Sequence, residues 1–491
     1  MSEGMMSRRA FCRSAAGGAV GLALRGALGG TTRPAERPNI LMVVTDDLGC
    51  QVGCYGDPIA RTPNIDGLAA EGVRFTRAYV TQASCSPSRS SMFTGMYPHQ
   101  NGQIGLAHRG YSMRPGLKTL PALLKAAGYR TGVLGKVHVK PGRDLPFDFH
   151  QFNATGTRDV ARTAKVADGF MHGGRGKPFF LMVNLFDPHR PFENTFRGLP
   201  KQPLGPDDVK PPPFLGVDAP EVRKEVAGYY NCAARADAGL GMLLRALARN
   251  GCEKNTIVMF LGDHGPPFPR AKLSCYEAGI RIPLVIRWPG RIEAGLVSDA
   301  LVSTIDFLPT LMEAAGGQTP EGLPGRSLAP LFDDAKVPWR ELLFAEYNSH
   351  THTASSFFPR RCVRDDRYKL IVNLLHDRDR SLRTPGAHGA AWEAAQQAEL
   401  DGMAAGSAWK TLARPPEVEL YDLKTDPVEF RNLADRADSR PVLQRLQKEL
   451  LAWRKRTDDP LLDRRKLAAL ARRHGAGEVK PRPGKGNRRK Q

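Results

Sequence analysis

The 491-residue sequence has few long hydrophobic runs. Apart from an Ala-, Gly- and Leu-rich stretch that ends near Gly30, no apolar run is long enough to span a bilayer, so stable membrane insertion is not expected. Cysteines are also scarce, and the spacing of the eight matches no zinc site. Most are expected to be buried free thiols, although Cys50 and Cys54 would be able to pair in an exported protein. Internal repeats are absent.

Acidic residues are outnumbered, with 50 Asp and Glu against 71 Lys and Arg and a net charge of +21. The imbalance is greatest between Arg464 and Lys490, where Glu478 is the single acidic residue. Prolines and glycines interrupt this segment, which predicts a disordered basic tail over residues 461–491. No nucleic-acid motif accompanies the basic run, so a nucleic acid is not the expected partner. The positive charge instead suits an anionic substrate such as a sulfated glycan.

The first 30 residues are typical of an export signal. Twin arginines, Arg8 and Arg9, are followed by Phe11 and then by a weakly apolar stretch. This order indicates a Tat-type signal over residues 1–30 and a periplasmic location. The alternative is a disordered basic start, and Arg25 counts for it because it interrupts the apolar run.

Apolar segments of strand length alternate with helical segments along the chain. The expected strands of the first part run over Asn39–Thr45, Thr131–Leu134, Phe179–Leu185, Thr256–Leu261 and Ile282–Ile286. The expected helices lie between Pro63 and Gly72, over Thr119–Ala127 and over Thr304–Ala315. This alternation predicts an α/β fold over residues 37–334, with a large, mostly parallel sheet sandwiched by helices.

The pattern changes near residue 335, which predicts a smaller C-terminal α+β subdomain over residues 335–460. Its expected strands are Glu341–Tyr347, Arg367–Val372 and Glu417–Asp422, and an amphipathic helix is expected over Val442–Trp453.

One cysteine stands in an unusual context. It begins the run Cys85-Ser86-Pro87-Ser88-Arg89, followed by Ser-Ser-Met-Phe-Thr-Gly. Neither a CxxC partner nor a neighbouring histidine is present to activate the thiol, so a chemically converted cysteine explains the run better. Pro87 suits the first turn of a helix, whose free N–H groups attract an anion, and Arg89 lies one turn further on.

Polar clusters follow three of the expected strands directly. Asp46 and Asp47 follow one strand, Asp263 and His264 follow another, and Asp187 and His189 follow a third. In open α/β sheets the site lies beyond the carboxyl ends of the strands. Adjacent acids repel each other, so the first two clusters predict a hard cation, with Ca²⁺ favoured and Mg²⁺ as the alternative.

Cys-x-Pro-x-Arg resembles the signature of the type I sulfatases, members of the alkaline phosphatase-like superfamily. The resemblance implies that a formylglycine-generating enzyme converts Cys85 to formylglycine, whose hydrate is the nucleophile beside the cation. Further polar residues follow the order and spacing of this family, although each alone would be unremarkable. They are Lys136 and His138, which strand alternation would put on one face, His189 as acid for the leaving group, and Lys272 as a sulfate-binding cation.

Several stretches resemble the N-sulfoglucosamine sulfohydrolases, the heparan sulfamidases, within that family. Among them are His99-Gln100-Asn101-Gly102 and Asp187-Pro188-His189-Arg190. The resemblance implies an N-sulfated glucosamine substrate, favoured over an O-sulfated one. Lys272, where the sulfamidases have arginine, matches the O-sulfatases instead. The expected substrate-binding residues are His99, Asp187, His350, His352 and Arg361, with a solvated loop around His350 as the alternative.

Two other functions fit the same residues. One is a phosphonate or phosphate monoester hydrolase of the same superfamily, and the other is an inactive protein that binds sulfated glycans. The oligomeric state is left open by the sequence.

Overall fold

β1 (Asn39–Thr45) lies in the middle of the large sheet, between β5 (Phe179–Leu185) and β6 (Thr256–Gly262), and it is parallel to both. The computed structural model describes residues 37–152, 157–174, 176–352, 356–376, 389–397 and 404–474. Every residue of β5 and β6 is buried, which explains why these strands are continuous apolar runs without alternation. The three strands end side by side, with Thr45 paired to both Leu185 and Gly262.

The large sheet has nine strands, and eight of them follow one path across it. Their order is β4 (Phe149–Gln151), β3 (Arg130–Leu134), β5, β1, β6, β7 (Arg281–Arg287), β2 (Val73–Tyr79) and β8 (Leu296–Ser298), and β9 (Val302–Ser303) pairs with β2. Only β7 runs antiparallel to its neighbours within this sheet. The predicted mostly parallel sheet is confirmed.

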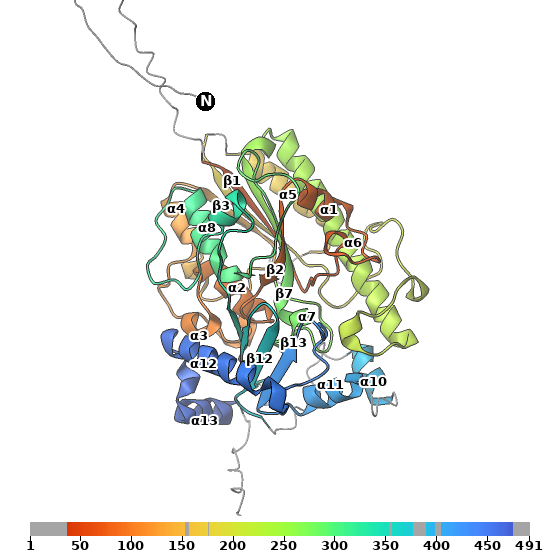
Figure 1. The fold of residues 1–491 in the computed structure, drawn as a ribbon. Helices are drawn as coiled ribbons and strands as arrows, with labels where there is room; N and C mark the ends of the chain where they lie inside the picture. The colour runs from red at the N-terminus through yellow and green to blue at the C-terminus, as the bar shows by residue number, and fades with distance from the viewer. Residues whose placement is uncertain are drawn as a thin grey trace, which may run out of the picture. The chain divides into compact units, whose positions relative to one another are not determined.

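Helices cover both faces of this sheet (Figure 1). One layer holds α1 (Pro63–Ala70), α5 (Val160–His172) and the 30-residue α6 (Pro220–Arg249), and α6 packs against both of the others. The opposite layer holds α2 (Cys85–Thr94), α4 (Leu120–Ala126) and α8 (Phe307–Ala314). The short helices are α3 (Pro98–Asn101), α7 (Glu277–Ile280) and α9 (Ala329–Asp333).

A second, antiparallel sheet follows after residue 335, in the order β10 (Leu343–Tyr347), β11 (Arg360–Arg364), β12 (Tyr368–Asn373) and β13 (Val418–Asp422). α12 (Arg440–Arg456) packs on it through Leu446, Leu450 and Trp453. The remaining helices are α10 (Gly389–Gln397), α11 (Ala404–Ala413) and α13 (Arg464–Arg473). Both sheets belong to one compact unit that begins at Arg37.

α13 contradicts part of the predicted disordered tail. The helix packs Ala471 against Phe357 and Leu375, and His474 contacts Tyr111. Its apolar residues recur at helical spacing between the basic ones, so an amphipathic helix forms where composition alone indicated disorder. Residues 475–491 of the predicted tail and the predicted signal at residues 1–30 lie outside the described residues.

Seven cysteines lie in the described part of the chain, and all are unpaired. Cys50 and Cys54 therefore form no disulfide in this structure. None of the helices in the described ranges combines the length and the hydropathy needed to cross a membrane.

Candidate active site

Three carboxylates meet at the carboxyl ends of β1 and β6. Asp46 and Asp47 follow β1, and Asp263 follows β6, so the parallel pairing of these strands brings the acids together. The backbone N–H of Asp47 donates to Oδ1 of Asp263 at 2.9 Å. All three side chains are fully buried, and burying three like charges is costly unless cations balance them.

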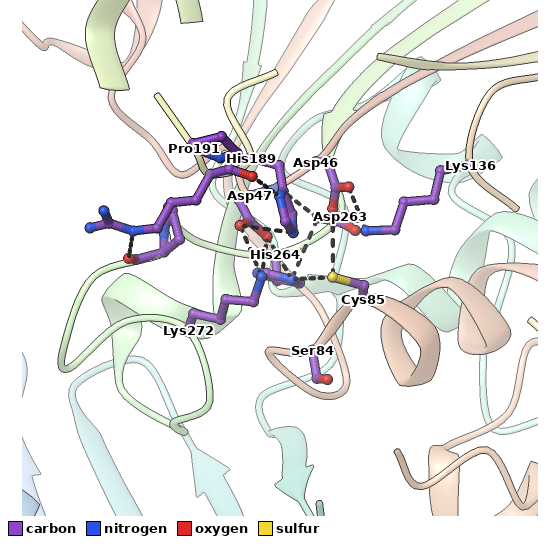
Figure 2. Close-up of polar contacts among 12 residues, drawn as sticks. Asp46, Asp47, Ser84, Cys85, Lys136, His189, Pro191, Asp263, His264 and Lys272 are labelled. Atoms are coloured by element: carbon purple, nitrogen blue, oxygen red, sulfur yellow. Dashed lines mark hydrogen bonds and ion pairs between the residues drawn. The ribbon is translucent and has the colours of Figure 1, made fainter. Parts of the chain in front are cut away.

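Cys85 is the first residue of α2, as predicted, and lies next to these acids (Figure 2). Its Sγ is 3.6 Å from Oδ1 of Asp46 and 3.4 Å from Nε2 of His264. The helix N-terminus adds positive potential at this point, which favours an anion. The ligand atoms of Asp46, Cys85, Asp263 and His264 all lie within 4.8 Å of one another, close enough to contact one ion.

Three cations surround the acids. Arg89 donates from Nε to Asp263 at 2.9 Å, Lys136 Nζ lies 2.5 Å from Asp46, and Lys272 Nζ lies 2.7 and 2.9 Å from the two oxygens of Asp47. Burial raises the pKa of Asp46, but Lys136 and other cations outweigh it and hold that pKa well below its usual range. Lys272 likewise holds the pKa of Asp47 below its usual value, whereas burial raises the pKa of Asp263.

The donor atoms of this cluster fit a divalent cation. Nδ1 of His264 donates to the carbonyl of Gly265 at 2.9 Å, which leaves Nε2 facing Oδ1 of Asp47 at 3.1 Å. Burial lowers the pKa of His264, yet Asp263 and Asp47 raise it to about 9, so the acids attract a positive charge to this nitrogen. A metal ion would supply that charge in place of the proton, with three carboxylates as hard ligands.

Arg89 has one unused donor. Its Nη1 donates to Oδ1 of Asn184 at 2.6 Å and to the carbonyl of Lys136 at 3.0 Å. Its Nη2 is buried, has no hydrogen-bond partner among the described residues, and lies 3.8 Å from Asp46. A buried N–H without an acceptor is costly, so this atom is suited to an anionic oxygen bound beside residue 85.

Lys136 and His189 contact the acids directly, and His138 lies close enough for the charges of Lys136 and Asp46 to act on its ring. β3 ends at Leu134, so Lys136 and His138 stand in the following loop, where His138 has a φ of 55°. The expectation that strand alternation puts Lys136 and His138 on one face was therefore wrong. His189 Nε2 lies 4.0 Å from Oδ2 of Asp47, and its Nδ1 lies 2.6 Å from the carbonyl of Arg190.

The two histidines predicted to bind substrate in the loop after β10 have different positions. His350 Nδ1 lies 2.9 Å from Oγ of Ser84, next to Cys85, and burial with Lys272 and His264 holds its pKa well below the usual range. His350 is therefore a neutral group at the site. His352 stacks on Tyr111, with ring centroids 4.1 Å apart, in an aromatic cluster that also contains His474.

Three predicted substrate contacts are instead buried structural groups. His99 bonds to Glu346 through Nδ1, at 2.6 Å, and through its backbone N–H. Asp187 accepts hydrogen bonds from the buried guanidinium groups of Arg158 and Arg235. These side chains are fully partnered within the protein, so they do not support the predicted contact with a sugar.

Arg361 is the third predicted substrate contact that is a buried structural group. It lies in the buried strand β11. It makes two 2.8 Å hydrogen bonds to Asp459.

Two further residues, which the sequence patterns did not predict, contact the site. Asn184 is the one amide within the apolar strand β5, and a polar residue in a fully buried strand is a signal that would have identified it. His108 Nδ1 lies 2.7 Å from Nε2 of His138. His108 lies in a short turn, and the sequence around it contains no motif that would have indicated a contact with the site.

Comparisons with known proteins agree with this geometry. The sulfatase family model matches residues 38–317, and a model described as N-sulphoglucosamine sulphohydrolase, C-terminal, matches residues 268–381. Human N-sulphoglucosamine sulphohydrolase is 32% identical, over 87% of this chain and 91% of its own length. An ulvan-active sulfatase from Formosa agariphila is 31% identical, over 87% of this chain and 82% of that protein. The chain belongs to the sulfatase family.

Solved structures of similar fold include one in complex with its substrate D-glucosamine-2-N,6-O-disulfate. Its TM-score is 0.66 at 21% identity, over 86% of this chain and 99% of that one. The phosphonate monoester hydrolase of Agrobacterium radiobacter has a TM-score of 0.63 at 20% identity, over 86% of this chain and 96% of its own. At these identities the likeness establishes the alkaline phosphatase-like fold.

Proposed function

We propose that this protein releases sulfate from a glycosaminoglycan-type sugar, with an N-sulfate favoured over an O-sulfate. The proposal includes conversion of Cys85 to formylglycine by a separate generating enzyme. The observation that carries it is the position of Cys85 at the N-terminus of α2, within reach of Asp46 and His264 and among buried cations. The N-sulfate preference is supported by the relationship to human N-sulphoglucosamine sulphohydrolase and by the C-terminal family match.

Asp46, Asp47, Asp263 and His264, with residue 85, would hold a divalent cation, for which Ca²⁺ is the candidate. When bound, the ion would lower the cost of placing negative charge on oxygen next to it. A formylglycine hydrate would supply two hydroxyl groups on one carbon, one for attack on sulfur and one for expelling sulfate. A serine or an unmodified thiol lacks the second group.

Arg89 and Lys136 bind negative charge at the nucleophile. Nη2 of Arg89 is the unused donor at this position, and Lys136 Nζ is held on Asp46 beside it. Both groups are buried, so their interaction with a developing oxyanion is screened little by water.

His189 and Lys272 orient the sulfate and supply the leaving group with its proton. Both stand against Asp47, on the side of the cluster opposite Lys136 in Figure 2. Burial lowers the pKa of His189, so its ring is neutral and acts as an acid only after it takes a proton, whereas Asp47 raises the pKa of Lys272 and keeps it a cation. His138 takes the proton of the second hydroxyl when sulfate leaves.

The test compares sulfate release from glucosamine N-sulfate, glucosamine 6-O-sulfate and a matched phosphonate ester. We expect the largest kcat/KM for the N-sulfate, and no turnover by Cys85→Ala although it folds and binds the metal. A larger value for the 6-O-sulfate would contradict the N-sulfate preference. Preferred cleavage of the phosphonate, or saccharide binding without any hydrolysis, would contradict the sulfohydrolase assignment.

We also propose export through the twin-arginine signal at Arg8 and Arg9. Replacing both by lysine is expected to retain the protein in the cytoplasm, measured by cell fractionation. Unchanged fractionation would contradict this part of the proposal.

A further inference from the structure

His108 and His138 form a pair at the edge of the catalytic cluster. Nδ1 of His108 lies 2.7 Å from Nε2 of His138, and the rings are stacked with centroids 4.9 Å apart and planes 16° apart. His108 comes from the turn Ala107–Arg109 and is exposed, whereas His138 follows β3. The contact thus joins a surface residue to a residue of the site.

The other nitrogen of His138 is buried and has no hydrogen-bond partner among the described residues. Burial, with Lys136, lowers the pKa of His138 to about 2, so the ring is neutral and carries one proton. Burial and Arg109 also lower the pKa of His108, so the Nδ1 of that ring can accept a hydrogen bond. Lys136, Asp46 and Arg89 are the charges of the cluster that act on the His138 ring.

The proton of His138 has two possible positions. If it is on Nε2, it is donated to His108, and Nδ1 keeps a free lone pair. If it is on Nδ1, a buried N–H is left without an acceptor, which is the more costly arrangement. The contact with His108 therefore selects the form of His138 in which Nδ1 can act as a base.

We propose that His108 is a positioning residue that fixes His138 as the Nε2–H tautomer and so keeps its Nδ1 available as the base at residue 85. This inference rests on the proposed function, which assigns the proton transfer. The O–H bond at residue 85 breaks, its proton moves to Nδ1, and the electron pair left on oxygen forms the carbonyl as sulfate departs with the electrons of the C–O bond. Nε2–H stays hydrogen-bonded to His108, and the proton on Nδ1 is later released to water.

The first test reads the tautomer directly and does not need turnover. In protein with ¹⁵N-labelled histidine, the His138 ring nitrogens are assigned by their loss in His138→Gln. We expect Nε2–H in the wild type and a mixture of tautomers in His108→Leu. An Nδ1–H tautomer in the wild type would overturn the inference.

The second test separates positioning from folding. His108→Leu removes the acceptor, whereas the side-chain oxygen of His108→Asn can occupy the place of Nδ1. We expect kcat to fall about tenfold to a hundredfold in His108→Leu with KM changed less than about twofold, and to recover largely in His108→Asn. His150→Leu, which replaces an exposed histidine in β4, is the control and should retain wild-type kcat.

The outcomes distinguish the two proposals. Equal kcat in the wild type and His108→Leu would contradict the role of His108 alone. A wild type that has the Nε2–H tautomer but hydrolyses no sulfate would contradict the proposed function. Equal losses of kcat in the Leu and Asn variants would show that shape, rather than hydrogen-bond acceptance, matters at this position and would overturn the inference.

Discussion

Nε2 of His264 lies 3.1 Å from Oδ1 of Asp47, while Nδ1 of the same ring is held by the carbonyl of Gly265. The ring is therefore fixed with one nitrogen towards the acids. Asp46 and Asp263 complete a set of buried oxygen donors around this nitrogen and Cys85. Several carboxylate oxygens and one imidazole nitrogen facing one point are the donor set that a hard divalent cation takes.

Removal of divalent metal is expected to abolish sulfate release and to lower Tm, because only the folded chain brings these ligands together. Adding Ca²⁺ back should restore both, with a Tm that rises with Ca²⁺ concentration. Asp263→Asn, measured by scanning calorimetry in parallel, should lose most of that rise. A Tm independent of metal in the wild type would contradict the metal site.

Replacing Arg361 is expected to reduce stability without a specific effect on catalysis. Arg361→Met leaves the carboxylate of Asp459 buried with Arg454 as its remaining cation. Breaking a buried pair of this kind costs about 3 kcal/mol, which urea unfolding would measure. The folded fraction should keep wild-type KM for the sugar. A large increase in KM at unchanged stability would instead restore the substrate-binding role predicted from the sequence.

Glu429 should make stability depend on pH. Burial raises its pKa from 4.5 to about 7, although Lys369 opposes the shift with a 2.7 Å contact. The folded state therefore keeps a proton that the unfolded chain has released, and this contribution to stability is lost as the pH rises from about 4.5 to about 7. Glu429→Gln should show a flatter profile in urea unfolding across this range than the exposed control Glu313→Gln. Identical slopes for the two variants would rule out the shift.

Much of the fold is visible in the sequence because β1 and β5 are buried on both faces and are therefore uninterrupted apolar runs. Their bounds, Asn39–Thr45 and Phe179–Leu185, match the prediction. β2 was missed because it alternates apolar and polar residues, with Arg74 and Thr76 facing away from the core. α6 was also missed, since its apolar residues are diluted by alanine, glycine and charged residues.

The acidic cluster could be predicted from the sequence because Asp46 and Asp263 directly follow two parallel strands. The carboxyl ends of such strands lie at the same edge of the sheet, independently of the conformation of the loops. The outer part of the site depends on partners far away in the chain. His99 is paired with Glu346, and Arg361 with Asp459, at separations of 247 and 98 residues. The sequence around a polar residue does not show whether its side chain contacts a ligand or a carboxylate far away in the chain. The structural roles of His99 and Arg361 therefore became visible only in the structure.

The most direct test of the account is the mass of the peptide that contains residue 85, taken from enzyme that releases sulfate. We predict a mass below that of the cysteine form and a product with a hydrazide, because an aldehyde has replaced the thiol of Cys85. A fully active enzyme whose peptide retains the cysteine mass and does not react with hydrazide would contradict the account.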